Sequence, residues 1–267
     1  MSTHEDRLKA LREELAKRRL TGFVVPLTDE HMSEYVGSYA QRLAWLTGFQ
    51  GSAGTAVVMP EDAAIFTDGR YTLQVREQVD GKNWEYVGIP GTSVSDWLAH
   101  HADSGAKIGY DPWLHTRKWV KTAEKALAEK GAELVPVDTN PIDAIWPDKP
   151  LPSDAKLIVH EDRFAGKSSS QKRQELADEL AEKGADAAVL AALDSIAWTF
   201  NVRGADVDYT PVALAYAVVH ADATADLYVD NDKLSDEVRR HLGNGVRVHE
   251  RGGFEQGLAD LSGKSVI

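Results

Sequence analysis

The 267-residue sequence contains no cysteine. Disulfide bridges, thiolate metal sites and cysteine nucleophiles are therefore excluded, and the composition suits a reducing compartment. The opening segment, MSTHEDRLKALREEL, is charged and patterned like a helix, whereas an export signal needs a positive start followed by an apolar run. We therefore expect a cytoplasmic protein.

Basic residues are fewer than acidic ones, with 30 Lys and Arg against 42 Asp and Glu. The resulting net charge of −12 repels phosphate backbones, so we expect no nucleic-acid partner. Long hydrophobic runs are also missing, because the longest apolar stretches, 187–193 and 212–219, fall far short of the ~20 residues that span a bilayer. We therefore expect no membrane segment.

The sequence does contain an alternation of helix and strand patterns. In the first half, apolar residues at helical spacing predict helices over 4–19, 71–79, 93–102 and 115–131. Short apolar and β-branched runs predict strands at 22–27, 55–59, 63–68, 85–89, 107–110 and 133–137. The predicted fold class is α/β, with mixed sheets flanked by helices.

Prolines mark a boundary near the middle of the chain. Four of the ten prolines lie at 141, 147, 150 and 152, in a stretch that sustains neither a helix nor a central strand. We place the domain boundary there, which gives domains 1–150 and 151–267. Each domain is expected to contain a mixed sheet of about five or six strands.

The second half of the sequence repeats the first. An offset of 165 residues aligns Leu11 with Leu176 and Val24 with Val189 without a gap. Further along, LAWLTG at 43–48 corresponds to IAWTFN at 196–201. Two copies of one α/β unit are therefore predicted. Duplication for stability alone, with neither copy catalytic, stays an alternative because a fold does not determine a function.

Two segments of the first half are candidates for ligand binding. In Asp68-Gly69-Arg70-Tyr71 a strand ends and the Arg70 guanidinium follows, at the carboxyl edge where α/β sheets bind ligands. Arg70 can receive a carboxylate or a carbonyl group, and the alternative is an ion pair with Asp68. The segment 29–35, which contains His31, is a polar insertion that the second copy lacks. It is either a functional loop or a plain surface loop.

Three other motifs favour structural roles. The glycines of GFQGSAG at 48–54 lack the spacing of a phosphate-binding loop and indicate a tight turn, and SGKS at 262–265 lacks Walker spacing. Asp206 and Asp208 form a D-x-D pair, which is a weak candidate for a hard cation and a stronger one for a loop cap. The histidines occur without chelating spacing, so we expect no metal site in this chain.

Two blocks of the first half read LTDEHMSEYVGSYAQRLAWLTGFQGSAGTAVV and FTDGRYTLQVREQV. They resemble the N-terminal domain of Xaa-Pro aminopeptidases, in the creatinase and methionine aminopeptidase superfamily. The second half contains IWPDKPLP, FAGKSSSQKRQELADEL, LDSIAWTFNVRGADVDYTPV and ADLYVD. These blocks are similar to the linker and second domain of the three-domain, cytosolic form of that enzyme. The resemblance covers nearly all of the chain.

The resemblance implies a longer enzyme of which this chain is the N-terminal region. In that family a C-terminal pita-bread domain holds two divalent ions, usually manganese, and a metal-bound hydroxide removes the first residue from peptides with proline second. Those ligands are not in this sequence, so the chain alone is expected to be inactive and to hold no cofactor. Its implied partners are the catalytic domain, proline-containing peptides and a second copy in a homodimer.

The same resemblance implies a role for these two domains. They are expected to cover part of the active site, restricting access to flexible peptides, and to assist assembly, with Arg70 and His31 facing the substrate. Creatinase itself has one such unit rather than two, which disfavours an amidinohydrolase. The remaining alternative is a non-catalytic peptide- or protein-binding module of the same superfamily.

Overall fold

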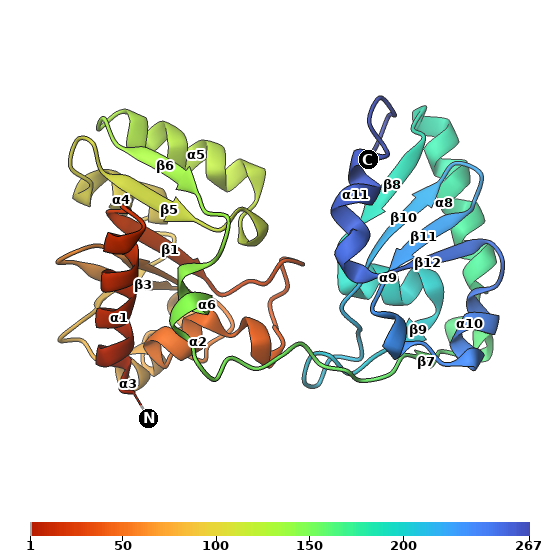
Figure 1. The fold of residues 1–267 in the computed structure, drawn as a ribbon, viewed down its shortest axis with the longest axis horizontal. Helices are drawn as coiled ribbons and strands as arrows, with labels where there is room; N and C mark the ends of the chain where they lie inside the picture. The colour runs from red at the N-terminus through yellow and green to blue at the C-terminus, as the bar shows by residue number, and fades with distance from the viewer. Residues whose placement is uncertain (1) are drawn as a thin grey trace. The chain divides into compact units, whose positions relative to one another are not determined.

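The computed structural model describes residues 2–267, which form two compact units (Figure 1). The first unit ends at Leu151 and the second comprises Pro152–Ile267. The sequence-based boundary at residue 150 lies one residue before this division. Because residues 148–157 carry no regular helix or strand, the chain crosses from one unit to the other through its proline-rich segment.

The first unit is built on a six-stranded mixed sheet, with the order β4-β3-β2-β1-β5-β6. Strand β1 lies antiparallel to β2, and β2 lies antiparallel to β3, while all other neighbours are parallel. The strands are β1 (Gly22–Pro26), β2 (Thr55–Val58), β3 (Ala63–Thr67), β4 (Glu85–Gly88), β5 (Lys107–Tyr110) and β6 (Glu133–Pro136).

Helices cover both faces of this sheet. The α-helices are α1 (His4–Lys17), α2 (Arg42–Thr47), α3 (Gln74–Gln78), α4 (Val94–His101), α5 (Arg117–Ala128) and α6 (Pro141–Ile145), and the 3₁₀ helices are η1 (Ser38–Ala40), η2 (Gly69–Tyr71) and η3 (Pro112–Leu114). One core contains Leu8, Leu11 and Leu15 of α1. The other contains side chains of α4 and α5. The leucines that recur at helical spacing in the sequence thus form one buried stripe of α1, which packs against the sheet.

The predicted helix over 71–79 is shorter in the structure. Residues 69–71 form the 3₁₀ helix η2, and the α-helix α3 begins only at Gln74. The carboxylate of Asp68 accepts the backbone N–H of Arg70 and caps the 3₁₀ turn. The local cap therefore determines the conformation immediately after β3.

The second unit contains a four-stranded sheet with the order β12-β11-β10-β8 and a separate pair, β7-β9. The strands are β7 (Ile158–Val159), β8 (Ala187–Leu190), β9 (Val202–Arg203), β10 (Tyr216–His220), β11 (Ala225–Tyr228) and β12 (Val246–His249). The expectation of five or six strands in one sheet is wrong for this unit. Residues 265–267 do hydrogen-bond along β8, but they form only the isolated bridge Ala187–Val266.

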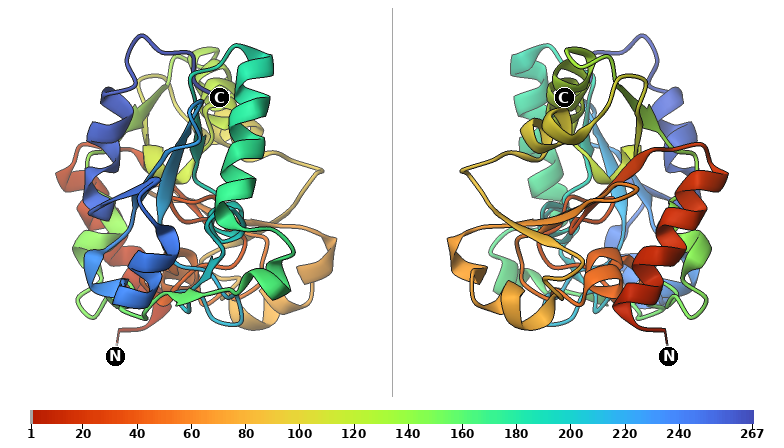
Figure 2. Two further views of the ribbon diagram at one scale, coloured as in Figure 1. Left: turned by 90° about the vertical axis from the view of Figure 1, so that its right-hand side faces the viewer. Right: turned by 90° about the vertical axis from the view of Figure 1, so that its left-hand side faces the viewer.

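The remaining elements of the second unit are helical. They are α7 (Asp162–Ala165), α8 (Ser169–Lys183), α9 (Leu193–Phe200), α10 (Asp236–Leu242) and α11 (Phe254–Ala259), with the 3₁₀ helices η4 (Asn231–Lys233) and η5 (Arg251–Gly253). Helix α8 runs along the length of the sheet (Figure 2). No helix within residues 2–267 is long and apolar enough to cross a membrane.

The internal repeat is visible in the topology of both units. Strands β8, β10, β11 and β12 follow the same antiparallel, antiparallel, parallel sequence of pairings as β1, β2, β3 and β4. Helices α8 and α9 take the places of α1 and α2 in chain order. One difference stands out: fifteen residues, 27–41, separate β1 from α2, whereas β8 and α9 are separated only by Ala191 and Ala192.

Candidate functional site

Three loops of the first unit meet at one edge of its sheet. Pro26 at the end of β1 pairs with Thr55 at the start of β2, and Thr55 pairs with Phe66 near the end of β3. Because both pairings are antiparallel, the loop after β1, the turn before β2 and the segment after β3 emerge at this common edge. The sheet register therefore brings together the two predicted candidate segments, 29–35 and 68–71.

Arg70 lies in the segment after β3 and is largely exposed, with 61% of its side-chain surface accessible. Its Nη2 donates to Asp68 Oδ2 at 2.7 Å, and its Nε donates to Asp68 Oδ1 at 3.1 Å. These hydrogen bonds hold the pKa of Asp68 below its usual range and raise the pKa of Arg70. The predicted ion pair is therefore present, and it fixes the guanidinium without covering it.

The outer edge of the Arg70 guanidinium stays available to a ligand. Nη1 makes no hydrogen bond to any residue within 2–267, and the group lies over the ring of Tyr71, 5.0 Å from its centroid. A guanidinium held by a carboxylate on one side and an aromatic face on another is oriented before any ligand arrives. Arg70 can thus donate to a carbonyl or carboxylate oxygen.

A serine connects the three loops. Ser52, in the turn before β2, donates its hydroxyl hydrogen to Glu34 Oε1 at 2.7 Å and lies 2.8 Å from the Tyr71 hydroxyl. Since the single Ser52 hydrogen is directed to Glu34, the Tyr71 hydroxyl donates to Ser52 Oγ. The sequence analysis did not identify Glu34, Ser52 or Tyr71 as a group, because their contact depends on the sheet register.

Close packing of the turn at 48–54 positions Ser52. A Cβ atom on Gly51 would lie 2.4 Å from Phe49 Cζ and 2.8 Å from Tyr71 Cδ1. The rings of Phe49 and Tyr71 pack edge to face, with centroids 5.8 Å apart. The tight turn predicted from GFQGSAG is therefore present, and glycine is required at position 51 because the rings of Phe49 and Tyr71 occupy the space that a side chain would need.

The predicted polar insertion is an ordered loop. Asp29 is fully buried, and its Oδ1 accepts the backbone N–H groups of His31 and Ser33, each at 3.0 Å. His31 itself is buried, with 6% of its surface exposed. The residues that follow it, 32–34, reach the neighbouring cavity. Asp29 thus shapes the loop, and substrate contact by His31 remains a prediction.

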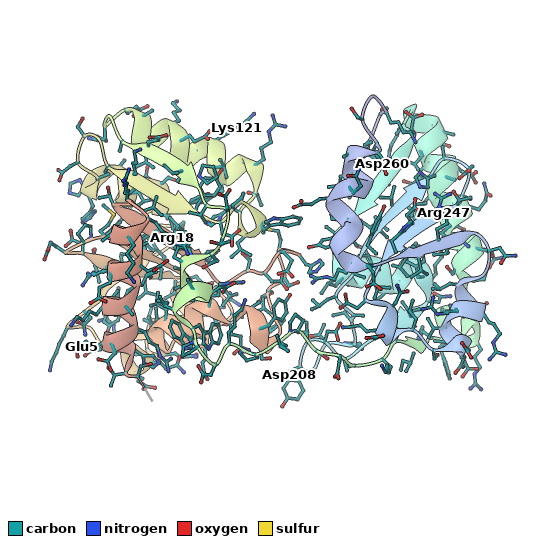
Figure 3. The ribbon with its side chains drawn as sticks, in the orientation of Figure 1. Glu5, Arg18, Lys121, Asp208, Arg247 and Asp260 are labelled. Atoms are coloured by element: carbon teal, nitrogen blue, oxygen red, sulfur yellow. The ribbon has the colours of Figure 1, made fainter. Side chains whose placement is uncertain are left out.

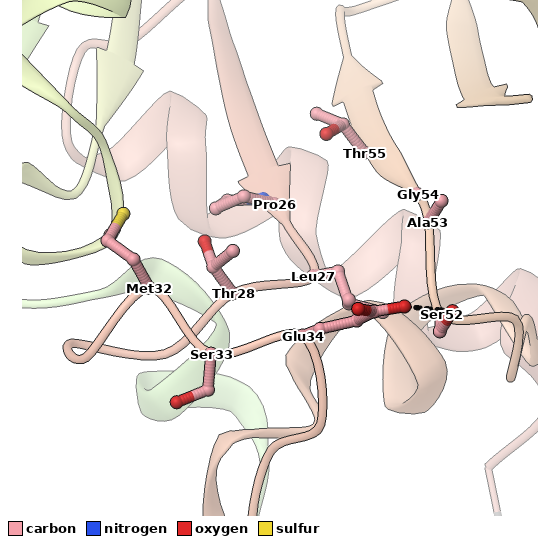
Figure 4. A pocket seen from close by; sticks show the side chains of 10 residues that line it. All are labelled: Pro26, Leu27, Thr28, Met32, Ser33, Glu34, Ser52, Ala53, Gly54 and Thr55. Atoms are coloured by element: carbon pink, nitrogen blue, oxygen red, sulfur yellow. Dashed lines mark hydrogen bonds between the residues drawn. The ribbon is translucent and has the colours of Figure 1, made fainter. Parts of the chain in front are cut away.

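A cavity of about 260 Å³ lies between this loop and the start of β2 (Figure 4). Its lining comprises Pro26, Leu27, Thr28, Met32, Ser33, Glu34, Ser52, Ala53, Gly54 and Thr55. Most of these side chains are apolar or small, and the Glu34 carboxylate supplies the charge. The cavity is therefore suited to a single side chain or a short peptide segment rather than to a large cofactor.

Of the D-x-D pair in the second unit, Asp206 has a structural role. Asp206 is buried and pairs with the buried ammonium group of Lys233. Its Oδ2 also accepts the backbone N–H of Leu214 at 2.7 Å, while Asp208 is exposed (Figure 3). No group of three or more His, Asp or Glu side chains within residues 2–267 is arranged to hold a metal ion. The described residues therefore do not fit a di-metal centre.

A second charged cluster surrounds Asp226 on β11. Its carboxylate accepts hydrogen bonds from Arg247 at 2.7 and 2.8 Å and contacts His220 at 2.6 Å and His249 at 2.7 Å. Burial by itself raises the pKa of Asp226, but these hydrogen bonds outweigh burial and hold that pKa far below its usual range. The cluster fastens β10, β11 and β12 together and is an element of stability.

The same order of strand pairings in both units defines a duplicated mixed-sheet α/β fold. Family comparison matches residues 7–145 and residues 148–267 each to a creatinase/prolidase N-terminal domain. The chain belongs to this family and contains two copies of its domain. The family predicted from the sequence is thereby confirmed.

Similar proteins have related names. "Probable Xaa-Pro aminopeptidase P" of Neosartorya fischeri is 39% identical over 247 residues, covering 91% of this chain and 38% of that protein. The protein of the same name from Aspergillus clavatus is 40% identical over 247 residues, which are 37% of its length. This chain therefore spans little more than a third of the length of these relatives.

A solved structure has the same architecture. The X-prolyl aminopeptidase from Caenorhabditis elegans, described as a cytosolic enzyme with a di-nuclear active site, superimposes with a TM-score of 0.92 at 31% sequence identity. The alignment covers 97% of this chain and 44% of the C. elegans chain. The two units described here thus correspond to less than half of that enzyme.

Proposed function

We propose that this chain forms the two N-terminal domains of a longer Xaa-Pro aminopeptidase. The longer protein would remove the first residue from peptides with proline in second position. Support comes from the relatives named above, of which the chain spans 38% or less. Two divalent ions, which we expect to be manganese, would supply the hydrolytic chemistry in the catalytic domain. A homodimer in the cytoplasm is the expected form.

The role proposed for this chain is to bind and orient the peptide. The observation that carries it is the fixed, exposed guanidinium of Arg70 at the common edge of three loops. Nη1 would donate to a carbonyl or terminal carboxylate oxygen of the peptide, since Asp68 already occupies Nε and Nη2. The buried His31 would contribute to the same face through the loop that Asp29 shapes.

Arg70 is expected to act through substrate affinity. In the longer protein with manganese and an Arg-Pro-Pro peptide, Arg70→Ala should raise KM and lower kcat/KM about tenfold, the loss of one charge-assisted hydrogen bond worth about 1.4 kcal/mol. Steady-state kinetics measure this, and Arg117→Ala is the matched control because Arg117 is an exposed arginine at the start of α5. An unchanged KM in Arg70→Ala would contradict the proposed role.

The same assay distinguishes the proposed peptidase from a protein that only binds peptides. The longer protein should cleave the Arg-Pro-Pro peptide with manganese, whereas this chain alone should not. Binding of the peptide by the intact protein without cleavage would instead support a non-catalytic peptide-binding member of the superfamily. Sedimentation of the intact protein measures the expected homodimer.

A further inference from the structure

The Glu34 carboxylate lies at the rim of the cavity beside Ser52. Glu34 Oε1 accepts the Ser52 hydroxyl at 2.7 Å, and Glu34 forms no ion pair with any residue within 2–267. The nearby guanidinium of Arg70 is engaged by Asp68 at 2.7 Å. The Glu34 carboxylate therefore keeps its negative charge at the rim of the cavity without a direct ion pair.

The remaining walls of the cavity are suited to an aliphatic chain. Pro26 and Leu27 form one part of the lining, and Met32 lies on the loop that runs past them (Figure 4). Met32 is held at φ +58° by the loop and is 39% exposed. A long side chain can therefore lie along apolar atoms and end at the carboxylate of Glu34. Lysine and arginine have this combination of a hydrocarbon stem and a cationic head.

We propose that this cavity is a subsite for a lysine or arginine side chain of a bound peptide. Its methylene groups would pack against Leu27 and Met32, and its charged head would bind Glu34, which Ser52 orients. The proposal rests on the proposed function, since it requires that this sheet edge faces a peptide. Charge complementarity favours this occupant, because the Glu34 carboxylate would repel an acidic side chain. The net charge of −12 also attracts basic peptides.

The test is a titration of this 267-residue chain with peptides followed by ¹⁵N–¹H NMR spectra. Three Ala-Pro-Pro peptides without arginine differ only in a later residue, which is lysine, its uncharged analogue norleucine, or glutamate. The lysine peptide should bind about threefold more tightly than the norleucine peptide, as for a partly exposed ion pair. The largest shifts should fall on Met32, Glu34 and Ser52.

Variants assign the preference to one side chain. Glu34→Gln should remove the difference between lysine and norleucine, and Glu34→Lys should reverse the preference toward glutamate. Glu61→Gln is the matched control, because Glu61 is exposed in the turn between β2 and β3, at the opposite end of β2. The spectra themselves show whether each variant is folded.

Two results would overturn the proposal: equal binding of the lysine and norleucine peptides, or a lysine preference that persists in Glu34→Gln. Cleavage by the longer protein is measured separately. Cleavage of Arg-Pro-Pro peptides without any Glu34-dependent preference would refute the subsite and leave the proposed function in place. If this chain shows a Glu34-dependent preference but the longer protein does not cleave the peptides, the proposed enzymatic function is refuted and the proposed subsite stands.

Discussion

At the scale of single residues, buried charge in the second unit is matched by specific partners. The Asp226 carboxylate faces Arg247 and His249 from β12 and His220 from β10. Arg247 lies on the outer strand (Figure 3). The ionised form of Asp226 is therefore favoured in the folded state, and the stability of the unit depends on that form.

Asp226 makes the unfolding free energy of the second unit depend on pH. Because its folded-state pKa is lowered, its contribution is complete above the unfolded value near 3.9 and is lost as pH falls below it. Asp226→Asn should cost about 2 kcal/mol of unfolding free energy at pH 7, as expected for hydrogen bonds to a charged group. The difference from the unaltered chain should shrink below about pH 4.

Urea unfolding at a series of pH values measures this dependence. Asp178→Asn is the control, since Asp178 is exposed on α8. A penalty for Asp226→Asn that stays constant down to pH 3 would show that the carboxylate charge is not the cause.

At the scale of elements, the turn before β2 determines how the candidate site is assembled. Ser52 reaches Glu34 and Tyr71 because the turn is tight and the rings of Phe49 and Tyr71 pack beneath it. Thr67, at the end of β3, donates to the carbonyl oxygen of Ala53 at 2.7 Å and secures the turn to the sheet. The turn is therefore held against the end of β3 and the segment that follows it.

Gly51→Ala should disturb this arrangement. The added methyl group would lie 2.4 Å from Phe49 Cζ, so we expect a loss of about 2 kcal/mol from overpacking and altered shifts of Ser52 and Tyr71. Gly69→Ala is the control, because a Cβ there meets no atom within 4 Å. Thermal unfolding and NMR spectra measure both effects. Equal effects of the two substitutions would argue against the role of the aromatic pair.

Sequence patterns predicted the elements better than the site. The leucine spacing of α1 predicted a helix over 4–19, and the structure has His4–Lys17. Periodicity alone did not predict the 3₁₀ helix η2 after β3. This helix depends on a local contact, in which the Asp68 carboxylate accepts a hydrogen bond from the backbone N–H of Arg70. Arg70 was identifiable from its position after a strand. The contact of Glu34 with Ser52 was not, although Glu34 lies within the predicted segment 29–35, because the two residues lie 18 positions apart in sequence and meet only through the pairing of β1 with β2.

At the scale of the whole molecule, the chain consists of two units with separate cores. The division falls between Leu151 and Pro152. The clusters of apolar side chains that fill each unit draw only on residues of that unit. Each core can therefore stabilise its own unit, and a substitution in one core should affect that unit first.

Lys233→Met tests this independence. Removing the ammonium group leaves the buried Asp206 carboxylate without its cation, which should cost about 3 kcal/mol. Hydrogen exchange should show loss of protection within residues 152–267 and unchanged protection in the first unit. In the double variant Lys233→Met with Asp206→Leu, the loss should be smaller than the sum of the two single losses. Exchange that accelerates equally in both units would contradict separate stability.

The insertion between β1 and α2 has a consequence for how the two halves can diverge. Fifteen residues separate these elements in the first unit, but the second joins β8 to α9 through Ala191 and Ala192. Since the pairing of the four repeated strands is the same in both units, the longer connection adds surface at one end of the first sheet without altering the shared pairing. Substitutions in this connection can therefore change the surface of the first unit while the strand pairing common to both units stays the same.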